Sequence, residues 1–248
     1  MNADVTRAPL TGPDQHTRPT QDGASASPTA ERFLTLALDV IHRAVDTQRE
    51  AIDRAAELIA TRLADGGHWW AFGTGHSHML VEELWGRAGG LVECRPILEP
   101  SLMLHEGLDK SSLLERQAGL AETLLEIHPV GSGDCLLVVS NSGRNAVPVE
   151  FAAGARRRGA AVIALTSLAH SAAVASRAPS GRRLFELADV VIDNCGVPGD
   201  AVVPHEPHPV GPTSTIVGAL LAQALSVEVI GRMERRGRPL ATLLSINA

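Results

Sequence analysis

The sequence contains no tyrosine and few other aromatic residues: phenylalanine, tryptophan and tyrosine together make up 3% of its 248 residues. Surfaces that bind single-stranded nucleic acid rely on stacked aromatic rings, so this chain has little material for one. Positive charge is also scarce, since 22 lysines and arginines stand against 28 acidic residues and the formal net charge is −6. An acidic chain is poorly suited to wrap duplex DNA. We therefore expect no nucleic-acid partner.

Cysteine is rare as well, with three residues far apart in the sequence, Cys94, Cys135 and Cys195. An odd number without a CxxC pair predicts neither a disulfide framework nor a zinc site. Long hydrophobic runs are missing: the N-terminus shows no signal-like apolar segment, and the least polar stretch, 216–227, is too short to span a bilayer. These absences predict a cytoplasmic protein with no membrane partner.

The N-terminal part differs in composition from the rest of the chain. Residues 1–29 are rich in Thr, Pro, Asp, Gln, Ser, Gly and Ala and have few large apolar side chains, so burial cannot offset the entropy of ordering them. We expect a disordered tail there, followed by a single domain over 30–248. From Glu31 to Leu63 apolar residues recur at helical spacing, which predicts an N-terminal helical arm.

Beyond the arm, short apolar runs alternate with helical segments. Strands are expected at HWWAFG (68–73), LVEC (91–94), CLLVVS (135–140), AVIALT (161–166) and DVVID (189–193), and the longer helices near 79–87, 111–127, 146–158 and 214–236. Such alternation is typical of a parallel sheet with helices on both faces. The sequence predicts an α/β fold: a three-layer αβα sandwich with a flavodoxin-like five-stranded parallel sheet. Sheets of this kind bind ligands at the carboxyl ends of their strands.

The first strand runs into a glycine-containing loop, GTGHSH (73–78), that begins like the dinucleotide fingerprint GxGxxG. Glu93, at the end of the next predicted strand, would be the ribose-binding acid of that alternative. His78 stands in the third glycine position, so the fingerprint is incomplete. His76 and His78 also suggest a metal, but no nearby cysteine or carboxylate completes a ligand set. We therefore expect no metal and no cofactor.

A second loop, SNSGRN (140–145), directly follows another predicted strand. Asn145 is a suitable N-cap for a helix that begins at Ala146. Free amides at a helix N-terminus, the hydroxyls of Ser140 and Ser142, and a glycine that allows close approach together make an anion cradle. An ordinary strand-to-helix turn uses the same residue types. Composition alone leaves both interpretations open.

This loop, the strand before it and AVIALTSLAHS after it resemble the phosphosugar-binding core of the sugar isomerase (SIS) domain family, whose usual pattern is Ser-x-Ser-Gly-x-Thr/Asn. GTGHSHMLVEELWGRAGG, ILEPSLMLHEGLDKSS, DVVIDNCGVPGDA and VGPTSTIVGA resemble a little-characterised branch of that family, akin to phosphoheptose isomerase and N-acetylmuramic acid 6-phosphate etherase. The resemblance runs from about Phe33 to Ile246. It is more specific for the domain than for the reaction, because the family contains isomerases, lyases, amidotransferase modules and sugar-phosphate-sensing regulators.

The resemblance implies a site that holds a phosphorylated sugar or amino sugar. The residues it implies for phosphate and sugar binding are Gly73, Thr74, Gly75, Ser77, Ser140, Asn141, Ser142, Gly143, Asn145, Thr166, Ser167, Ser214 and Thr215. The last two open the final predicted helix, so their hydroxyls could cap that helix instead of touching substrate.

Candidate catalytic residues lie in two segments. EELWGR resembles the segment that supplies a catalytic glutamate in phosphoheptose isomerase, and Glu83 matches it. The spacing from Ser77 to Glu83 is shorter here by about one helical turn, which keeps the helix face but changes the depth. A solvated surface glutamate is the alternative. His105 is suited to proton exchange near neutral pH. We expect Glu83 as the base and His105 as its partner, with Glu106 as a further catalytic candidate.

The sequence therefore predicts a phosphosugar-binding SIS-domain protein that isomerises its ligand between aldose and ketose by general acid–base chemistry. An amino-sugar-phosphate lyase or etherase is one alternative, because it would begin with the same proton abstraction and then expel the substituent at the adjacent carbon. A non-catalytic sugar-phosphate sensor is another, and would need no acid–base pair. The resemblance also implies a homodimer or higher homo-oligomer.

Overall fold

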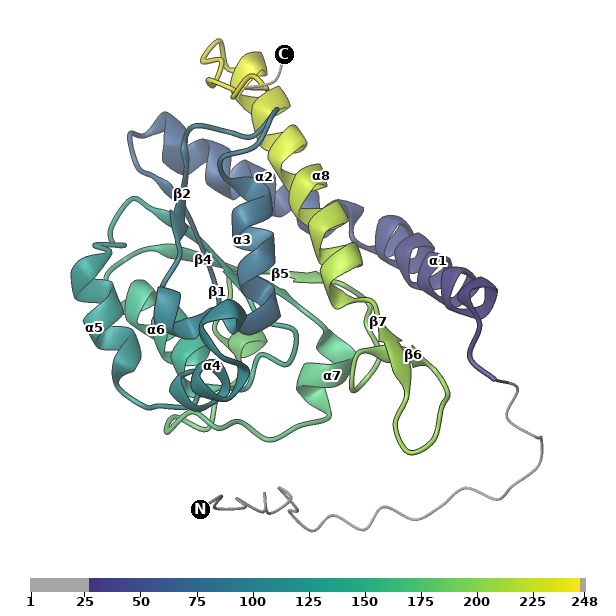
Figure 1. Ribbon diagram of the computed structural model, residues 1–248. Coiled ribbons are helices and arrows are strands. Elements are labelled where there is room, and N and C mark those ends of the chain that lie inside the picture. Colours follow the sequence, from purple (N-terminus) through teal and green to yellow (C-terminus); the bar gives the residue numbers. More distant parts are fainter. Residues whose placement is uncertain (1–26, 246–248) are drawn as a thin grey trace.

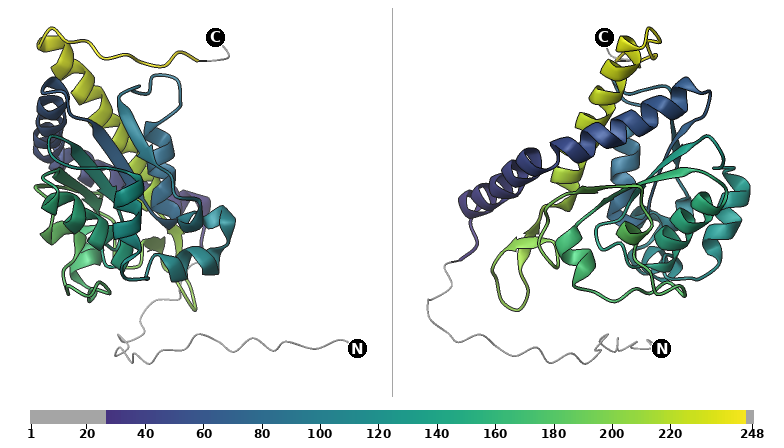
Figure 2. Two further views of the ribbon diagram at one scale, coloured as in Figure 1. Left: turned by 90° about the vertical axis from the view of Figure 1, so that its left-hand side faces the viewer. Right: turned by 180° about the vertical axis from the view of Figure 1, so that it is seen from behind.

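A computed structural model describes residues 27–245 (Figure 1). The described chain begins with two helices, α1 (Ala30–Thr47) and α2 (Arg49–Ala64), separated by Gln48. The predicted helical arm thus consists of two helices, and α1 projects from the body of the molecule (Figures 1 and 2). Residues 1–26 of the predicted disordered tail lie outside the described part of the chain.

Five parallel strands form the central sheet in the order β2-β1-β3-β4-β5. Their bounds are β1 (Trp69–Gly73), β2 (Cys94–Ile97), β3 (Cys135–Val139), β4 (Ala161–Thr166) and β5 (Val190–Asp193). This order is the flavodoxin-like one. The predicted fold class, an α/β sandwich around a five-stranded parallel sheet, is confirmed.

Alternate residues of the strands enter two separate cores, one on each face of the sheet. Trp69 and Leu137 face a core with helices α2, α3 (His78–Leu84) and α8 (Ser214–Arg235), whereas Trp70 and Leu136 face a core with α5 (Leu120–Ile127) and α6 (Ala146–Arg157). Every residue of β1, β3 and β4 is buried because helices cover both faces (Figure 2). The molecule therefore has the three predicted layers.

Strand β2 lies later in the chain than predicted, since it begins at Cys94 instead of ending there. The buried Leu91 had suggested a strand, but it forms an isolated bridge with Thr242 near the end of the chain. Pro96 lies within β2, which is possible because β2 is an edge strand and needs fewer backbone donors. Glu93 therefore precedes this strand and does not lie at its carboxyl end.

The segment predicted as one helix over 111–127 is two helices, α4 (Leu108–Leu114) and α5, and Gly119 precedes α5 with a φ of 85°. Sequence analysis also missed an antiparallel hairpin, β6 (Ala201–Val203) and β7 (Val210–Pro212), which leads into α8. The remaining helical elements are η1 (Gly75–Ser77), η2 (Pro100–Leu102), η3 (Leu104–Glu106), α7 (Leu168–Ala172) and η4 (Leu184–Glu186).

Helix α8 is long and apolar enough, by length and composition, to cross a membrane. It packs against α2 and α3, however, and buries Val217, Leu221 and Leu225 in the core on that face of the sheet. Packing inside the fold thus accounts for these apolar residues. The start of the same helix contributes side chains to the carboxyl edge of the sheet.

Candidate functional site

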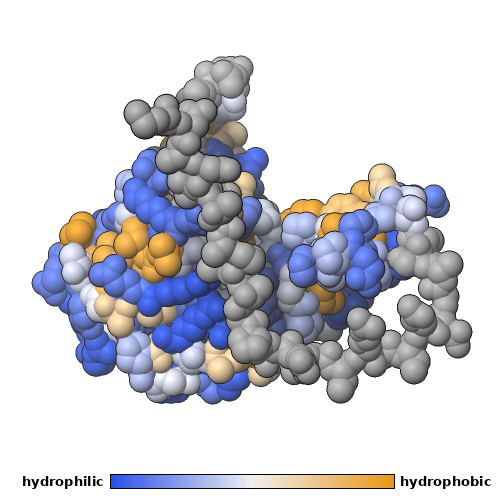
Figure 3. Space-filling model, turned by 60° about the horizontal axis from the view of Figure 1, so that its bottom comes forward, coloured by the Kyte–Doolittle hydropathy of each residue, from blue (hydrophilic) through white to orange (hydrophobic). Residues whose placement is uncertain are grey.

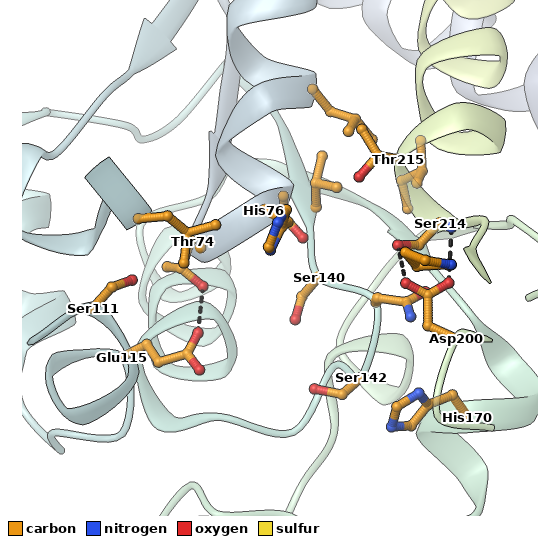
Figure 4. A pocket seen from close by; sticks show the side chains of 18 of the residues that line it. Thr74, His76, Ser111, Glu115, Ser140, Ser142, His170, Asp200, Ser214 and Thr215 are labelled. Atoms are coloured by element: carbon orange, nitrogen blue, oxygen red, sulfur yellow. Dashed lines mark hydrogen bonds between the residues drawn. The ribbon is translucent and has the colours of Figure 1, made fainter. Parts of the chain in front are cut away.

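A cavity of about 370 Å³ lies at the carboxyl edge of the sheet, where the fold class predicts a ligand (Figure 4). Its walls come from the loops after β1, β3 and β4, from α4 and from the start of α8. Most of the predicted binding residues line it, namely Thr74, Gly75, Ser77, Ser140, Asn141, Ser142, Ser214 and Thr215. The structure therefore brings together loops that are far apart in the sequence.

The other predicted binding residues lie behind the cavity wall and shape it. A side chain on Gly73 would lie 2.6 Å from the backbone oxygen of Ser77, so only glycine allows the chain to turn this closely. Thr166 is fully buried, and its Oγ1 donates to the backbone oxygen of Asn141 at 3.2 Å. Ser167 is also buried, and its hydroxyl is hydrogen-bonded inside the fold.

Gly143 sets the shape of the loop SNSGRN (140–145), called the serine-rich turn below. Its φ is 55°, a left-handed conformation that favours glycine. A Cβ at this position would lie 2.8 Å from Ser171 Oγ and 3.3 Å from Thr166 Oγ1. Its backbone N–H donates to Ser140 Oγ at 3.2 Å, which leaves the Ser140 hydroxyl hydrogen free to donate. The loop is thus a closely packed turn.

Asn145 departs from its predicted contact. Helix α6 begins at Ala146, as expected, but the Asn145 side chain makes no capping bond to it. Its Nδ2 instead donates to Glu115 Oε1 at 2.6 Å, and its Oδ1 accepts a hydrogen bond from Arg177 Nη1 at 3.1 Å. Asn145 is 8% exposed and does not line the cavity. Its side chain thus holds Glu115.

Glu115 lines the cavity, although sequence analysis did not single it out. Its Oε2 accepts a hydrogen bond from Thr74 Oγ1 at 2.9 Å (Figure 4). Burial raises the pKa of this carboxyl, whereas the Thr74 hydrogen bond and the charges of Arg116 and Arg177 oppose the rise. A carboxyl group with a raised pKa in a cleft is a candidate for proton transfer.

His170 lies near Ser142 in the same cavity (Figure 4). Its Nδ1 accepts the backbone N–H of Gly199 at 3.3 Å, so Nε2 carries the hydrogen of the neutral ring. Burial lowers the pKa of His170, Asp200 opposes this, and Arg144 adds to it. The lowered pKa favours the neutral ring, which donates from Nε2. Sequence analysis missed this residue too, because one histidine in a short helix carries no motif.

Asp200 and Ser214 form the wall where α8 begins. Asp200 accepts hydrogen bonds from Ser214 N at 2.8 Å and from Ser214 Oγ at 2.5 Å (Figure 4). It also accepts one from Thr213 N at 3.1 Å. Its carboxylate therefore satisfies backbone donors at the start of α8, as an acidic group does at a helix N-terminus. The Ser214 hydroxyl is engaged by this contact.

The structure does not bring the three predicted catalytic residues into this cavity. Glu83 lies on α3 and forms an ion pair with Arg87, and its Oε1 accepts a hydrogen bond from Gln223 on α8 at 3.0 Å. His105 and Glu106 lie in η3 with exposed side chains, and Glu106 pairs with Lys110 at 3.3 Å. None of the three is among the residues that line the cavity.

The two alternatives raised by the first loop receive no support from the geometry. His76 lines the cavity, but His78 is buried in α3 with Nδ1 3.4 Å from Glu82 Oε1. Over residues 27–245 no group of three or more His, Cys, Asp or Glu side chains is placed to hold a metal ion. Glu93 accepts the backbone N–H of Ala241 and lies away from the carboxyl edge that a nucleotide would occupy.

Comparisons with known proteins agree with this fold. The family model for the SIS domain matches residues 32–167. A UPF0309 protein of Halalkalibacterium halodurans is 45% identical over 200 residues, which cover 80% of this chain and 83% of that protein. The chain therefore belongs to the SIS domain family and groups with the UPF0309 proteins.

Two solved structures share the fold. A phosphoheptose isomerase from Francisella tularensis gives a TM-score of 0.52 at 16% identity and covers 80% of this chain and 95% of that one. The sugar isomerase domain of an RpiR transcription factor from Sphaerobacter thermophilus gives 0.50 at 19% identity, with coverages of 83% and 92%. The fold thus occurs both in an enzyme and in a regulator.

We predict that Gly143→Ala destabilises the protein by about 3 kcal/mol, because it adds a clash to the cost of a left-handed conformation. Gly66→Ala is the matched control: Gly66 has a φ of 87°, but nothing lies within 4 Å of an added Cβ. It should cost only about 1 kcal/mol. Urea unfolding measures both, and equal losses would show that the packing around Gly143 has no effect.

Proposed function

We propose that this SIS-domain protein binds a phosphorylated sugar or amino sugar and isomerises it between its aldose and ketose forms. The observation that carries the proposal is the cavity itself, which combines a serine-rich turn at a helix N-terminus with two groups suited to proton transfer, Glu115 and His170. Isomerisation of a phosphosugar needs a site for the phosphate anion and groups that transfer protons to and from the sugar.

The phosphate end of the ligand lies at the serine-rich turn. The hydroxyls of Ser140 and Ser142 line the cavity beside the start of α6, where the helix dipole favours an anion. Binding the phosphate away from the reacting carbons allows the binding energy to hold the sugar in a reactive geometry.

Glu115 acts as the base and His170 as the proton donor. Glu115 removes the proton from the carbon next to the carbonyl, the electrons of that C–H bond form the C=C bond of an enediol, and the carbonyl oxygen takes a proton from His170 Nε2. The proton on Glu115 then returns to the former carbonyl carbon, and the hydroxyl on the other carbon gives its proton back to His170. A raised pKa suits Glu115 to both steps.

This assignment differs from the sequence-based one, in which the family resemblance suggests Glu83 as the base and the chemistry of the side chains adds His105 and Glu106 as further catalytic groups. Glu115 is preferred because it lines the cavity and is bonded to Thr74 in the first loop. The two assignments make opposite predictions for single substitutions.

A sugar-phosphate sensor is the second candidate. Similarity to the sugar isomerase domain of a transcription factor favours it, because that domain has the same fold in a regulator. A sensor would bind the phosphosugar at the same turn without turnover. Isotope exchange between substrate and solvent therefore separates the two functions.

We also propose that the protein forms a homodimer or a higher homo-oligomer in the cytoplasm. Leu34 and Leu38 on α1 are 58% and 49% exposed, and apolar side chains are visible along this projecting helix (Figure 3). Burying them against a second copy would remove apolar surface from water. All three cysteines are free, which suits a reducing compartment. Light scattering should give a mass of at least two chains; the mass of one chain at micromolar concentration would contradict the assembly.

We predict that phosphorylated sugars raise the thermal midpoint of the protein and that the matching unphosphorylated sugars do not. Ser142→Ala removes a hydroxyl donor to a charged acceptor, so the affinity for the best phosphosugar should fall about tenfold. Titration calorimetry measures this affinity. If the phosphate made no difference to any ligand, the serine-rich turn could not be the phosphate site.

We predict that Glu115→Gln retains phosphosugar binding but lowers exchange of solvent deuterium into the sugar by about two orders of magnitude or more. Glutamine keeps the size of the side chain but cannot accept the proton. Glu83→Gln is the matched control and should exchange at nearly the normal rate. If only Glu83→Gln lost exchange, Glu83 on α3 would be the base and the assignment to Glu115 would be wrong. If the unmodified protein showed no exchange, the sensor function would be favoured.

A further inference from the structure

A chain of hydrogen bonds leads from the protein surface to the cavity. Arg177, in the loop after α7, donates from Nη1 to Asn145 Oδ1 at 3.1 Å. Asn145 Nδ2 donates to Glu115 Oε1 at 2.6 Å, and Glu115 Oε2 accepts from Thr74 Oγ1 at 2.9 Å. Arg177 therefore reaches Glu115 through the Asn145 amide.

The chemistry of the two ends determines the direction of this amide. A guanidinium group only donates hydrogen bonds, so it selects the oxygen of Asn145. The nitrogen of the same amide must then face Glu115, where it donates to the carboxylate. Such a bond favours the ionised form of the acid. Without Arg177 the amide can turn over and present its oxygen to Glu115, which would favour the protonated form.

Backbone contacts hold the Arg177 loop against the serine-rich turn. Arg177 N donates to Arg144 O at 2.7 Å, and Leu184 N donates to Gly143 O at 2.8 Å. Asn145 is buried, whereas Arg177 is exposed. A substitution at Arg177 can therefore change the hydrogen-bond chain with little effect on the core.

The charges around this chain are mostly positive. The charges of Arg116 and Arg177 lower the pKa of Glu115, and Arg177 itself interacts with the charges of Arg116 and Arg144. Burial and these two arginines lower the pKa of Arg177, and Glu115 opposes them. Because Arg116 remains when Arg177 is replaced, part of the positive charge that acts on Glu115 stays in place. An uncharged residue at position 177 therefore removes the direct effect of the Arg177 charge on Glu115 and also frees the Asn145 amide to turn, and both changes raise the pKa of Glu115.

We propose that Arg177 is a positioning residue for Glu115, because it holds the Asn145 amide with its nitrogen toward the carboxylate and so keeps this acid in the form that can accept a proton. The importance of this role for catalysis rests on the proposed function, in which Glu115 is the base. The hydrogen-bond chain itself can be tested without a substrate.

The experiment is a pH titration of the full chain without ligand, followed by carboxyl-carbon NMR of labelled glutamate. The signal of Glu115 is the one that Glu115→Gln removes. Arg177→Met should raise the pKa of Glu115 by about one unit, which means about tenfold less ionised acid at a given pH below the pKa. Lysine also donates hydrogen bonds without accepting them, so Arg177→Lys should keep the pKa of Glu115 near its value in the unmodified protein.

Arg182→Met is the matched control, since Arg182 lies in the same loop and its guanidinium donates to the backbone oxygen of Glu186. It should leave the titration of Glu115 unchanged. An unchanged titration in a folded Arg177→Met protein would overturn the proposal. If Arg177→Met does not fold, Arg177→Gln and Arg177→Lys decide: a raised pKa in the glutamine variant alone supports the role, and equal values overturn it.

Failure of this inference can be distinguished from failure of the proposed function. If the unmodified protein exchanges deuterium into no phosphosugar, the isomerase proposal fails, while the titration still decides the role of Arg177. Where exchange is found, its rate falls as the pH drops through the pKa of Glu115, because the base becomes protonated. In Arg177→Met this fall should begin at higher pH, with lower kcat near neutrality and an unchanged KM.

Discussion

The carboxyl group of Glu115 joins the two loops on which the cavity depends. Thr74 follows β1 and Asn145 follows β3, and these strands are neighbours in the sheet. Burying part of a carboxylate is costly unless hydrogen bonds satisfy it, and each oxygen of the half-buried Glu115 carboxylate accepts one. The backbone oxygen of Glu115 also accepts the N–H of Val147 at 3.0 Å. The chain just after α4 is thereby tied to both loops, and their hydroxyls open into the same space.

Close packing behind the serine-rich turn is the second constraint. Gly143 lies against Ser171 and Thr166, where no side chain fits, and the loop after α7 is hydrogen-bonded to the same turn. Because this packing already orders the turn, binding of the proposed phosphate ligand would cost little conformational entropy. Helix α7 therefore contributes to the site in two ways, because Ser171 packs against the turn and His170 lines the cavity near Ser142.

Sequence patterns predicted the parts of the structure that depend on local order. Buried runs such as 135–139 and 161–166 became central strands, since full burial on two faces leaves a clear apolar signal. Strand β2 was displaced because an edge strand has a weaker pattern. Sequence patterns could not predict the contacts of Glu115, because its hydrogen-bond partners Thr74 and Asn145 lie 41 and 30 residues away in the sequence. The same limit applies to Asn145. Its position before α6 predicted a helix cap, but its side chain instead donates a hydrogen bond to the carboxylate of Glu115, which is distant in the sequence.

Family resemblance predicted the fold, whereas the position of the base is a proposal that depends on helix α3. The fold depends on many buried side chains, so no single residue decides it. A base depends on one side chain, and the short α3 ends at Leu84 with Glu83 bonded to Gln223 on α8. If Glu115 is the base, as proposed, the segment after α4 sets the separation between the proton-transfer group and the serine-rich turn. Under the proposed function, that separation would determine which carbon of the sugar lies beside the base, and therefore which phosphosugar reacts.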